Sequence, residues 1–207
     1  MNRLASAALI ALVAAGMAAA QEITSISPNR VVAGSPDTVV TINGSGFTPN
    51  HLVAISDWVL TPNYINSTRL TVTVPADLLE YPMSTELYVF GAVGGWAFAP
   101  FDVTVPFATP PTLPPGTVGI PYEQPITILP PPEWEYEWTI SAGSLPPGLE
   151  FDYETYAIRG IPTEAGVFTF TIRVEEFYSE VPTWGDQAFV LTINPAILPL
   201  STSGPEA

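Results

Sequence analysis

The sequence has no cysteine, no lysine and a single histidine, His51, in 207 residues. Without cysteine no disulfide can stabilise an exported chain, so each domain has to be stable through its own hydrophobic core. The same absences remove thiol and lysine nucleophiles and the zinc sites built from cysteine and histidine. His51 follows the glycine-rich stretch 43–47 and Pro49, and we expect it to be a solvated loop residue. The sequence therefore predicts that the chain is not an enzyme.

Positive charge is also scarce, with 20 acidic residues against five arginines and a net charge of −15. A field of this sign repels phosphate backbones and anionic membranes, which argues against nucleic acid or lipid headgroups as partners. Solubility of an exported protein is one interpretation of the charge, and a cation-dependent role is the alternative. No cofactor is predicted, although calcium is possible on the hard oxygens of Glu150, Asp152, Glu154 and Asp186, which lack the spacing of an EF-hand loop.

The N-terminus has the pattern of a cleaved signal peptide over residues 1–20. Arg3 precedes an apolar, alanine-rich run that ends in three alanines before Gln21. An uncleaved anchor is the alternative, but a membrane span needs about 20 strongly apolar residues. We expect a mature chain that begins at Gln21, loses Arg3 and so changes its net charge from −15 to −16. It would be exported, to the periplasm, the cell surface or the medium, and the missing disulfides suggest a bacterial source.

What is abundant is proline, at 24 residues, and short runs of valine, isoleucine, threonine and phenylalanine between turn residues. This pattern predicts an all-β protein made of two tandem immunoglobulin-like β-sandwich domains. Residues 38–42 and 70–74 alternate apolar and hydroxyl side chains, as strands with one buried face do. The two glycines of 43–47 favour a turn, with Phe47 folded back as an apolar anchor.

Proline spacing suggests where the domains begin and end. Four prolines between 110 and 115 predict a stiff, extended connection, because proline cannot donate to a β-ladder. We expect the first sandwich at 21–106, a Pro-rich linker at 107–112, the second sandwich at 113–195 and a disordered tail at 196–207.

The first sandwich resembles the IPT/TIG family of immunoglobulin-like domains. The matching text is ITSISP at 23–28, AGS at 33–35, VVTINGSGF at 39–47 and STRLTVTVP at 67–75. The stretch 87–101 is less typical and richer in aromatic residues.

The second sandwich resembles the putative-immunoglobulin, cadherin-like family of bacterial surface and secreted proteins. It carries LPPGTVGIPY at 113–122, GSLPPGL at 143–149, RGIPTEAG at 159–166 and FTFTI at 168–172, in that order. Both resemblances imply spacers, adhesion units or parts of surface assemblies, without catalysis in the module itself. They imply a protein or glycan partner at a cell surface.

Aromatic and acidic side chains supply the remaining candidates. Trp58, Trp96, Trp134 and Trp184 are predicted ligand-binding residues of an alternative function, a carbohydrate-binding module, with Trp96 and Trp184 carried on loops. Tyr136 and Trp138 are expected in the core. A second alternative is a hydrolase with a carboxylate pair, drawn from Glu133, Glu135 and Glu137, although alternate residues of one strand are more typical of a solvated face.

Overall fold

A computed structural model describes residues 21–91, 95–129, 135–176 and 182–197, and divides the chain into two compact units. Unit 1 ends at Thr104 and unit 2 begins at Val105. Each unit is built from β-sheets, as predicted, and the secondary structure of the described residues includes no α-helix. Those residues form no helix with the length and hydropathy needed to span a bilayer. The predicted signal peptide, Glu133 and Trp134, and the tail from residue 198 lie outside the described residues.

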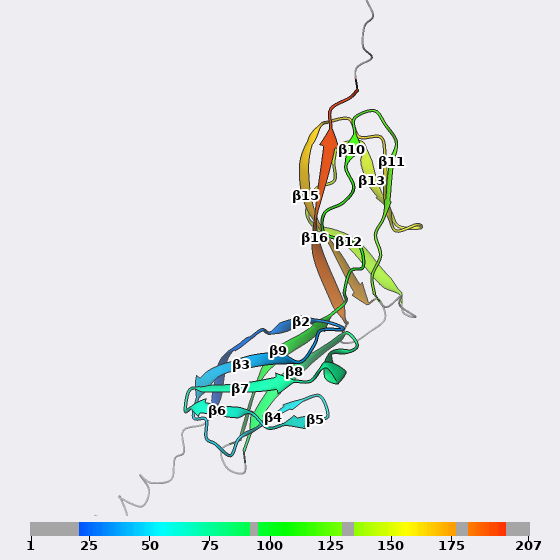
Figure 1. Cartoon of the computed structure of the whole chain (residues 1–207). Helices are drawn as coiled ribbons and strands as arrows, with labels where there is room; N and C mark the ends of the chain where they lie inside the picture. The colour runs from blue at the N-terminus through cyan, green and yellow to red at the C-terminus, as the bar shows by residue number, and fades with distance from the viewer. Residues whose placement is uncertain (1–20, 92–94, 130–134, 177–181, 198–207) are drawn as a thin grey trace, which may run out of the picture. The chain divides into compact units, whose positions relative to one another are not determined.

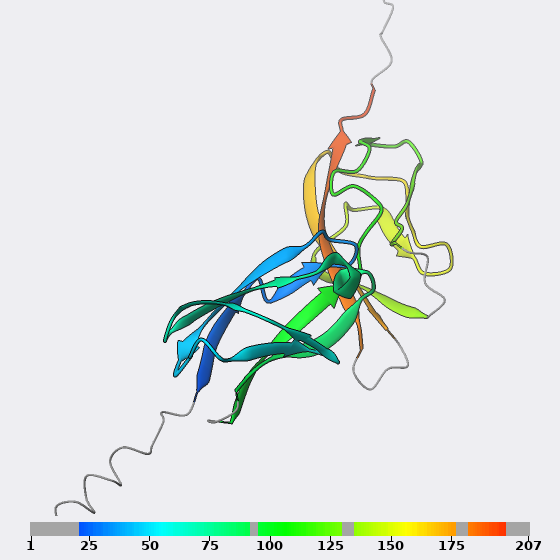
Figure 2. The ribbon, with the colours of Figure 1, turned by 60° about the horizontal axis from the view of Figure 1, so that its bottom comes forward.

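Unit 1 is a sandwich of a four-stranded and a five-stranded sheet (Figure 1, Figure 2). The four-stranded sheet has the order β1 (Glu22–Ser27), β3 (Thr38–Ser45), β7 (Arg69–Val74) and β6 (Asn63–Asn66). The five-stranded sheet has the order β2 (Arg30–Val32), β9 (Trp96–Thr104), β8 (Met83–Phe90), β4 (Leu52–Ile55) and β5 (Trp58–Leu60). A short 3-10 helix, η1 (Ala76–Leu79), follows β7.

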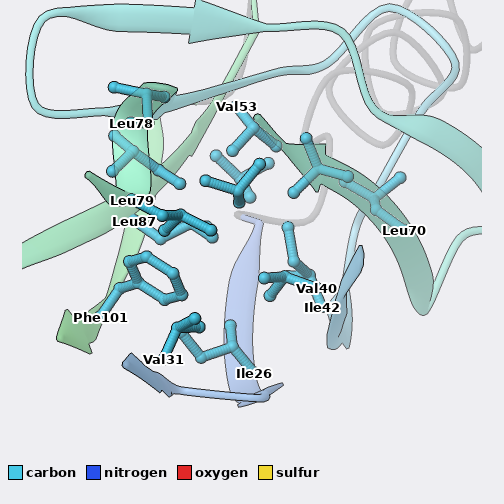
Figure 3. Packing of buried hydrophobic residues seen from close by; sticks show 14 of the residues in the cluster. Ile26, Val31, Val40, Ile42, Val53, Leu70, Leu78, Leu79, Leu87 and Phe101 are labelled. Carbon is cyan, nitrogen blue, oxygen red and sulfur yellow. The ribbon is translucent and has the colours of Figure 1, made fainter. Parts of the chain in front are cut away.

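The core of unit 1 lies between these two sheets. Val40, Ile42 and Leu70 come from the four-stranded sheet, and Figure 3 shows them facing Leu87 and Phe101 of the other sheet. The alternation in 70–74 buries one face, as the sequence predicts. In 38–42 the expected apolar and hydroxyl faces are not separated, since Val40 and Ile42 are buried but Val39 is 58% exposed. Burial of such aliphatic side chains contributes about 1.5–3 kcal/mol each, which is how a sandwich without disulfides is held together.

The turn after β3 also has its predicted form. Phe47 is buried, and its backbone N–H donates to the Ser67 carbonyl. A Cβ on Gly44 would lie 1.9 Å from the Glu22 carbonyl oxygen, so β1 can approach β3 this closely only beside a glycine.

Unit 2 packs a three-stranded sheet on a four-stranded one. The four-stranded sheet has the order β10 (Gly116–Thr117), β16 (Trp184–Asn194), β15 (Gly166–Glu176) and β12 (Tyr136–Gly143). The other has the order β11 (Tyr122–Pro125), β14 (Ala157–Gly160) and β13 (Leu149–Asp152). Phe170, Phe189 and Trp138 meet Phe151 and Ile158 in the core between them.

Residues 105–113, which include the segment predicted as a linker, run along β16 within unit 2. The Val190 N–H donates to the Pro111 carbonyl at 2.8 Å, and the Leu113 N–H donates to the Val190 carbonyl at 2.9 Å. The Phe107 ring meets the Trp138 and Phe189 rings edge to face, at 6.2 and 5.7 Å between centroids. Prolines are tolerated here because this segment borders the sheet, where a missing N–H costs little.

Candidate functional site

The tryptophans of the described residues occupy two kinds of position. Trp58, Trp96 and Trp184 are the first residues of β5, β9 and β16, so Trp96 and Trp184 lie on strands and not on the loops that the sequence suggested. Trp138 lies in the middle of β12 and is only 8% exposed, as predicted for a core residue, and Tyr136 packs against the same core. Trp96 is the opposite case at 73% exposed.

Trp96 belongs to a row of apolar side chains on the outer surface of the five-stranded sheet. Strand pairing places Val59 beside Ala54, Ala54 beside Tyr88, and Tyr88 beside Phe98. Because residues paired directly across antiparallel strands point to the same side, these side chains share one face. Trp96 shares it too, since it lies two residues from Phe98 on β9. We call Val59, Tyr88, Trp96 and Phe98 the aromatic face.

The rings of the aromatic face contact one another. Tyr88 stacks on Trp96 with centroids 5.8 Å apart and 25° between the planes, and it lies 5.8 Å from Phe98 at 43°. Stacking covers one side of the Trp96 ring and leaves the other side open. The Tyr88 hydroxyl donates to the Glu86 carboxylate, which raises the pKa of the Tyr88 phenol.

Gln21 anchors the hairpin that carries this face. Its buried side-chain amide donates to the Val89 carbonyl at 2.6 Å and to the Gly95 carbonyl at 2.9 Å. These two acceptors lie at the ends of β8 and β9, beside Trp96. The segment leading into β1 therefore fixes the strand ends that position the Trp96 ring.

Trp58 and Trp184 are not part of the aromatic face. Trp58 is exposed but pairs with the inward-facing Ile55, so it lies on the other side of the sheet at its β5 edge. Trp184 is in unit 2, where the Arg173 guanidinium lies 4.4 Å from its ring centroid. That cation–π contact leaves less of the Trp184 ring available to a ligand.

The candidate carboxylates of a hydrolase do not gather across a cleft in the described residues. Glu135 and Glu137 are exposed, and Glu137 lies on β12 directly opposite Glu175 of β15. Glu175 accepts a hydrogen bond from Arg173 Nε at 3.2 Å. Two carboxylates side by side on an open sheet face lack the concave pocket that glycoside hydrolysis uses.

Two family models match the chain, one for each unit. The model described as IPT/TIG domain matches residues 22–104, and the model described as Putative Ig domain matches residues 103–194. The chain carries an IPT/TIG domain followed by a Putative Ig domain. No curated protein sequence matches it.

Solved structures resemble these two domains only distantly. A putative α-galactosidase of Bacteroides fragilis is 22% identical over 44% of this chain and 18% of its own, with a TM-score of 0.34. SGBP-B of the Bacteroides ovatus mixed-linkage glucan utilization locus is 15% identical over 84% of this chain and 45% of its own, with a TM-score of 0.35. The protocadherin GammaB4 extracellular domain is 10% identical over 84% and 34%, with a TM-score of 0.37. The chain spans less than half the length of each of these proteins.

In the Putative Ig domain, the side chains of two calcium candidates, Asp152 and Glu150, interact with other residues of the domain. One Asp152 oxygen accepts the Glu154 N–H at 2.8 Å, and the other pairs with Arg159 at 2.8 Å. The Glu154 N–H, followed by the Thr155 side chain and the Arg159 charge, holds the pKa of Asp152 below its usual 3.8. Glu150 lies 3.8 Å from Arg159, and Asp186 is on β16. Among the described residues, no three acidic or histidine side chains form a group that could hold a metal ion.

In the IPT/TIG domain, the prediction that His51 is solvated was wrong. His51 is 5% exposed, and its Nδ1 accepts the Thr48 N–H at 2.9 Å. Its ring lies edge to face with Phe47 at 6.4 Å, and a Cβ on Gly91 would lie 2.5 Å from its Cδ2. Burial lowers the pKa of His51, since the imidazolium loses hydration there. Thr48 and Phe47 are near neighbours of His51 in sequence, whereas Gly91 is distant, and a local pattern does not reveal that contact.

Proposed function

We propose that this chain is an exported, non-catalytic binding protein whose IPT/TIG domain docks another protein through the aromatic face, in adhesion or in a larger surface assembly. The observation that carries the proposal is the exposure of Val59, Trp96 and Phe98 together on regular strands. Contiguous apolar patches of this kind mark interaction surfaces more often than isolated exposed residues do. Export is supported by the pattern of residues 1–20.

The chemistry of the face favours a protein over a sugar. Tryptophan, tyrosine and phenylalanine are enriched at protein interfaces, where large rings fill pockets of the partner. A sugar also needs polar groups beside the ring to pair with its hydroxyls. Glu86 lies two residues before Tyr88 on β8, and its carboxylate already accepts the Tyr88 hydroxyl.

The partner is a different protein and not a second copy of this chain. At a net charge of −15, two copies repel each other at long range, which opposes docking of one acidic surface on another. A partner with a basic surface would instead be attracted, and its association with this chain would become slower as salt screens the charges.

The experiment compares capture of exported proteins by the purified chain, by a Trp96→Ala/Phe98→Ala variant and by a control, Val167→Ala. Val167 is an exposed apolar residue of the other domain, so the control removes similar surface outside the face. Each captured protein is purified and its affinity measured. We expect the face variant to weaken binding at least about tenfold, as interface anchors do, and the control to leave it unchanged. Equal binding by all three chains would overturn the proposal.

Glycan binding is a second candidate, because the outer side of the Trp96 ring is open and flat enough to stack on a pyranose. Binding of the same three chains to a glycan array and to insoluble polysaccharides separates the two functions. Saturable glycan binding that disappears only in the Trp96→Ala/Phe98→Ala variant would replace the protein partner with a carbohydrate.

A further inference from the structure

The Putative Ig domain carries the longest edge strand of the described sheets, β12. It has eight residues, whereas the other edge strands have two to six. Proteins usually protect an edge from unwanted pairing with proline, lysine or a bulge. In β12 the bulge comes after Ile140, and the stretch 136–140 before it has no proline and no lysine.

The direction of the backbone groups of β12 follows from its neighbour β15. The Glu176 N–H donates to the Thr183 carbonyl at 2.9 Å, so Glu176 directs its backbone groups away from β12. These directions alternate along a strand, and Glu175 therefore directs its own groups toward β12, where it pairs with Glu137. Glu137 is thus hydrogen-bonded within the sheet.

The residues that alternate with Glu137 and Thr139 have the opposite direction. The backbone N–H and carbonyl groups of Tyr136, Trp138 and Ile140 point away from β15, toward the open edge. Within the described ranges, no other segment forms a backbone hydrogen bond with these groups. They form a row of donors and acceptors that a further strand could pair with.

A hollow of about 390 Å³ runs along the same edge. It is lined by four consecutive residues of β12 and by two tyrosines of the turn between β13 and β14: Tyr136, Glu137, Trp138, Thr139, Tyr153 and Tyr156. Consecutive residues of a strand direct their side chains to opposite faces. A hollow that borders all four therefore follows the backbone of β12 and not one face of it, which is the space that an added strand would fill.

The inner face of this edge is aromatic. Trp138 is buried and stacks on Tyr156 with 5.0 Å between centroids. Tyr153 and Tyr156 are nevertheless 58% and 42% exposed. Apolar side chains of an added strand, directed inward, would cover ring surface that is now in water.

The outer face of the edge is acidic. Glu137 is exposed and lies directly opposite Glu175, an unfavourable arrangement of like charges. Arg173 pairs with Glu175 at 3.2 Å, and no cationic side chain of the described residues pairs with Glu137. Unit 2 as a whole has thirteen acidic residues and two arginines, a net charge of −11. A basic side chain beside Glu137 would relieve this repulsion.

We propose that β12 binds an extended segment of a partner protein as an added strand of its sheet. The segment would exchange main-chain hydrogen bonds with Tyr136, Trp138 and Ile140, direct apolar side chains toward the rings and place a basic side chain beside Glu137. Pairing of β12 with β12 of a second copy would instead bring two acidic edges together, which is unfavourable.

The test is amide hydrogen exchange, followed by NMR, with the peptide acetyl-Ser-Val-Thr-Val-Lys-Val-Ser-amide. In an added antiparallel strand its valines lie opposite Tyr136, Trp138 and Ile140, and its lysine lies opposite Glu137. We expect these three amides to exchange faster than those of Glu137 and Thr139 in the free chain, and saturating peptide to slow them at least about tenfold. Slow exchange of all three in the dilute free chain, or no slowing by millimolar peptide, would overturn the proposal.

Two N-methylated peptides test the main-chain pairing. Methylation of the central valine removes the N–H that faces the Trp138 carbonyl, and it should weaken binding at least about tenfold. Methylation of the threonine alters an N–H that points away from β12, and it should change affinity less than about threefold. Equal losses with the two peptides would reject strand addition.

A charge reversal tests the outer face. The peptide with glutamate in place of lysine should bind the natural chain about threefold more weakly, and Glu137→Lys should reverse this preference. Glu164→Lys makes the same change of charge at another exposed position and should leave the preference as it is. The same response in both variants would show a diffuse effect of acidity and contradict the assigned register.

The aromatic face of the other domain is not needed for this pairing. The Trp96→Ala/Phe98→Ala variant should bind the peptide as the natural chain does, so failure of that face and failure of this edge are distinguishable. Exchange at Tyr136, Trp138 and Ile140 should also be independent of the concentration of the free chain. Slowing that increases with that concentration would assign the edge to a second copy and overturn the proposal.

Discussion

The two domains share a sandwich architecture but differ in what they leave at the surface. Unit 1 has seven acidic residues and three arginines, a net charge of −4, and exposes a row of apolar rings on regular strands. Unit 2 has a net charge of −11, and many of its rings, such as Trp138, Phe170 and Phe189, lie in the core. The comparison shows that the inner faces of a sandwich set the fold, whereas its outer faces are free to take different chemistry.

Trp138 and Trp96 provide the largest contrast between the domains. Trp138→Ala should destabilise unit 2 by about 3–5 kcal/mol, because it empties a site packed by Phe107, Phe151 and Tyr156. Trp96→Ala should change the stability of unit 1 by less than about 0.5 kcal/mol, since most of that ring is already in water. Denaturant unfolding, followed by NMR signals from each unit, measures both. Similar losses in the two variants would contradict the assignment of Trp96 to a binding surface.

The second contrast between the domains is the pH dependence of their stability. Unfolded His51 takes up a proton near pH 6.5, whereas the folded domain keeps the imidazole neutral to lower pH. The stability that this shift contributes to unit 1 is present above pH 6.5 and is lost as the pH falls toward the lowered pKa. Unit 2 has no histidine, and the contribution of Asp152 is lost only below about pH 3.8.

The measurement is the unfolding midpoint of each unit between pH 7.5 and pH 5. We expect the midpoint of unit 1 to fall across this range and His51→Asn to remove that dependence, since asparagine offers an acceptor to the Thr48 N–H without titrating. An equal fall in the variant would assign the effect to other groups.

Calcium should have the smallest effect. One Asp152 oxygen accepts the Glu154 N–H and the other pairs with Arg159, so the hairpin of β13 and β14 offers few free ligands to calcium. We expect the melting temperature of either unit to change by less than about 1 °C in millimolar calcium. A ligand adds little stability when its dissociation constant is much higher than its concentration. A rise confined to unit 2 that Asp152→Asn abolishes would restore calcium as a ligand.

Local patterns predicted the parts of the fold that depend on neighbours in sequence. Alternation in 70–74 identified which side chains are buried, and the two glycines before Phe47 identified its turn. Trp138 was expected in the core because of its place on a central strand of the pattern, and it lies there.

The aromatic face could not be predicted from the sequence in the same way. Residues 96–101 are Trp, Ala, Phe, Ala, Pro and Phe, which are apolar at both alternating sets of positions, so the pattern does not say which set points outward. Only pairing with β8 places Phe98 beside Tyr88. Likewise, the cover that Arg173 provides for Trp184 and the burial of His51 depend on contacts between distant segments.

The packing of residues 105–113 along β16 bears on how such modules are exchanged between proteins. A recombination event that joined a new neighbour at residue 113 would leave behind Phe107, whose ring fills space between Trp138 and Phe189. A junction at 104 and 105 would carry the whole packed unit. The second domain therefore begins earlier in the sequence than its proline pattern suggests. A copy of this domain fused to another protein should keep residues 105–113 in order to fold.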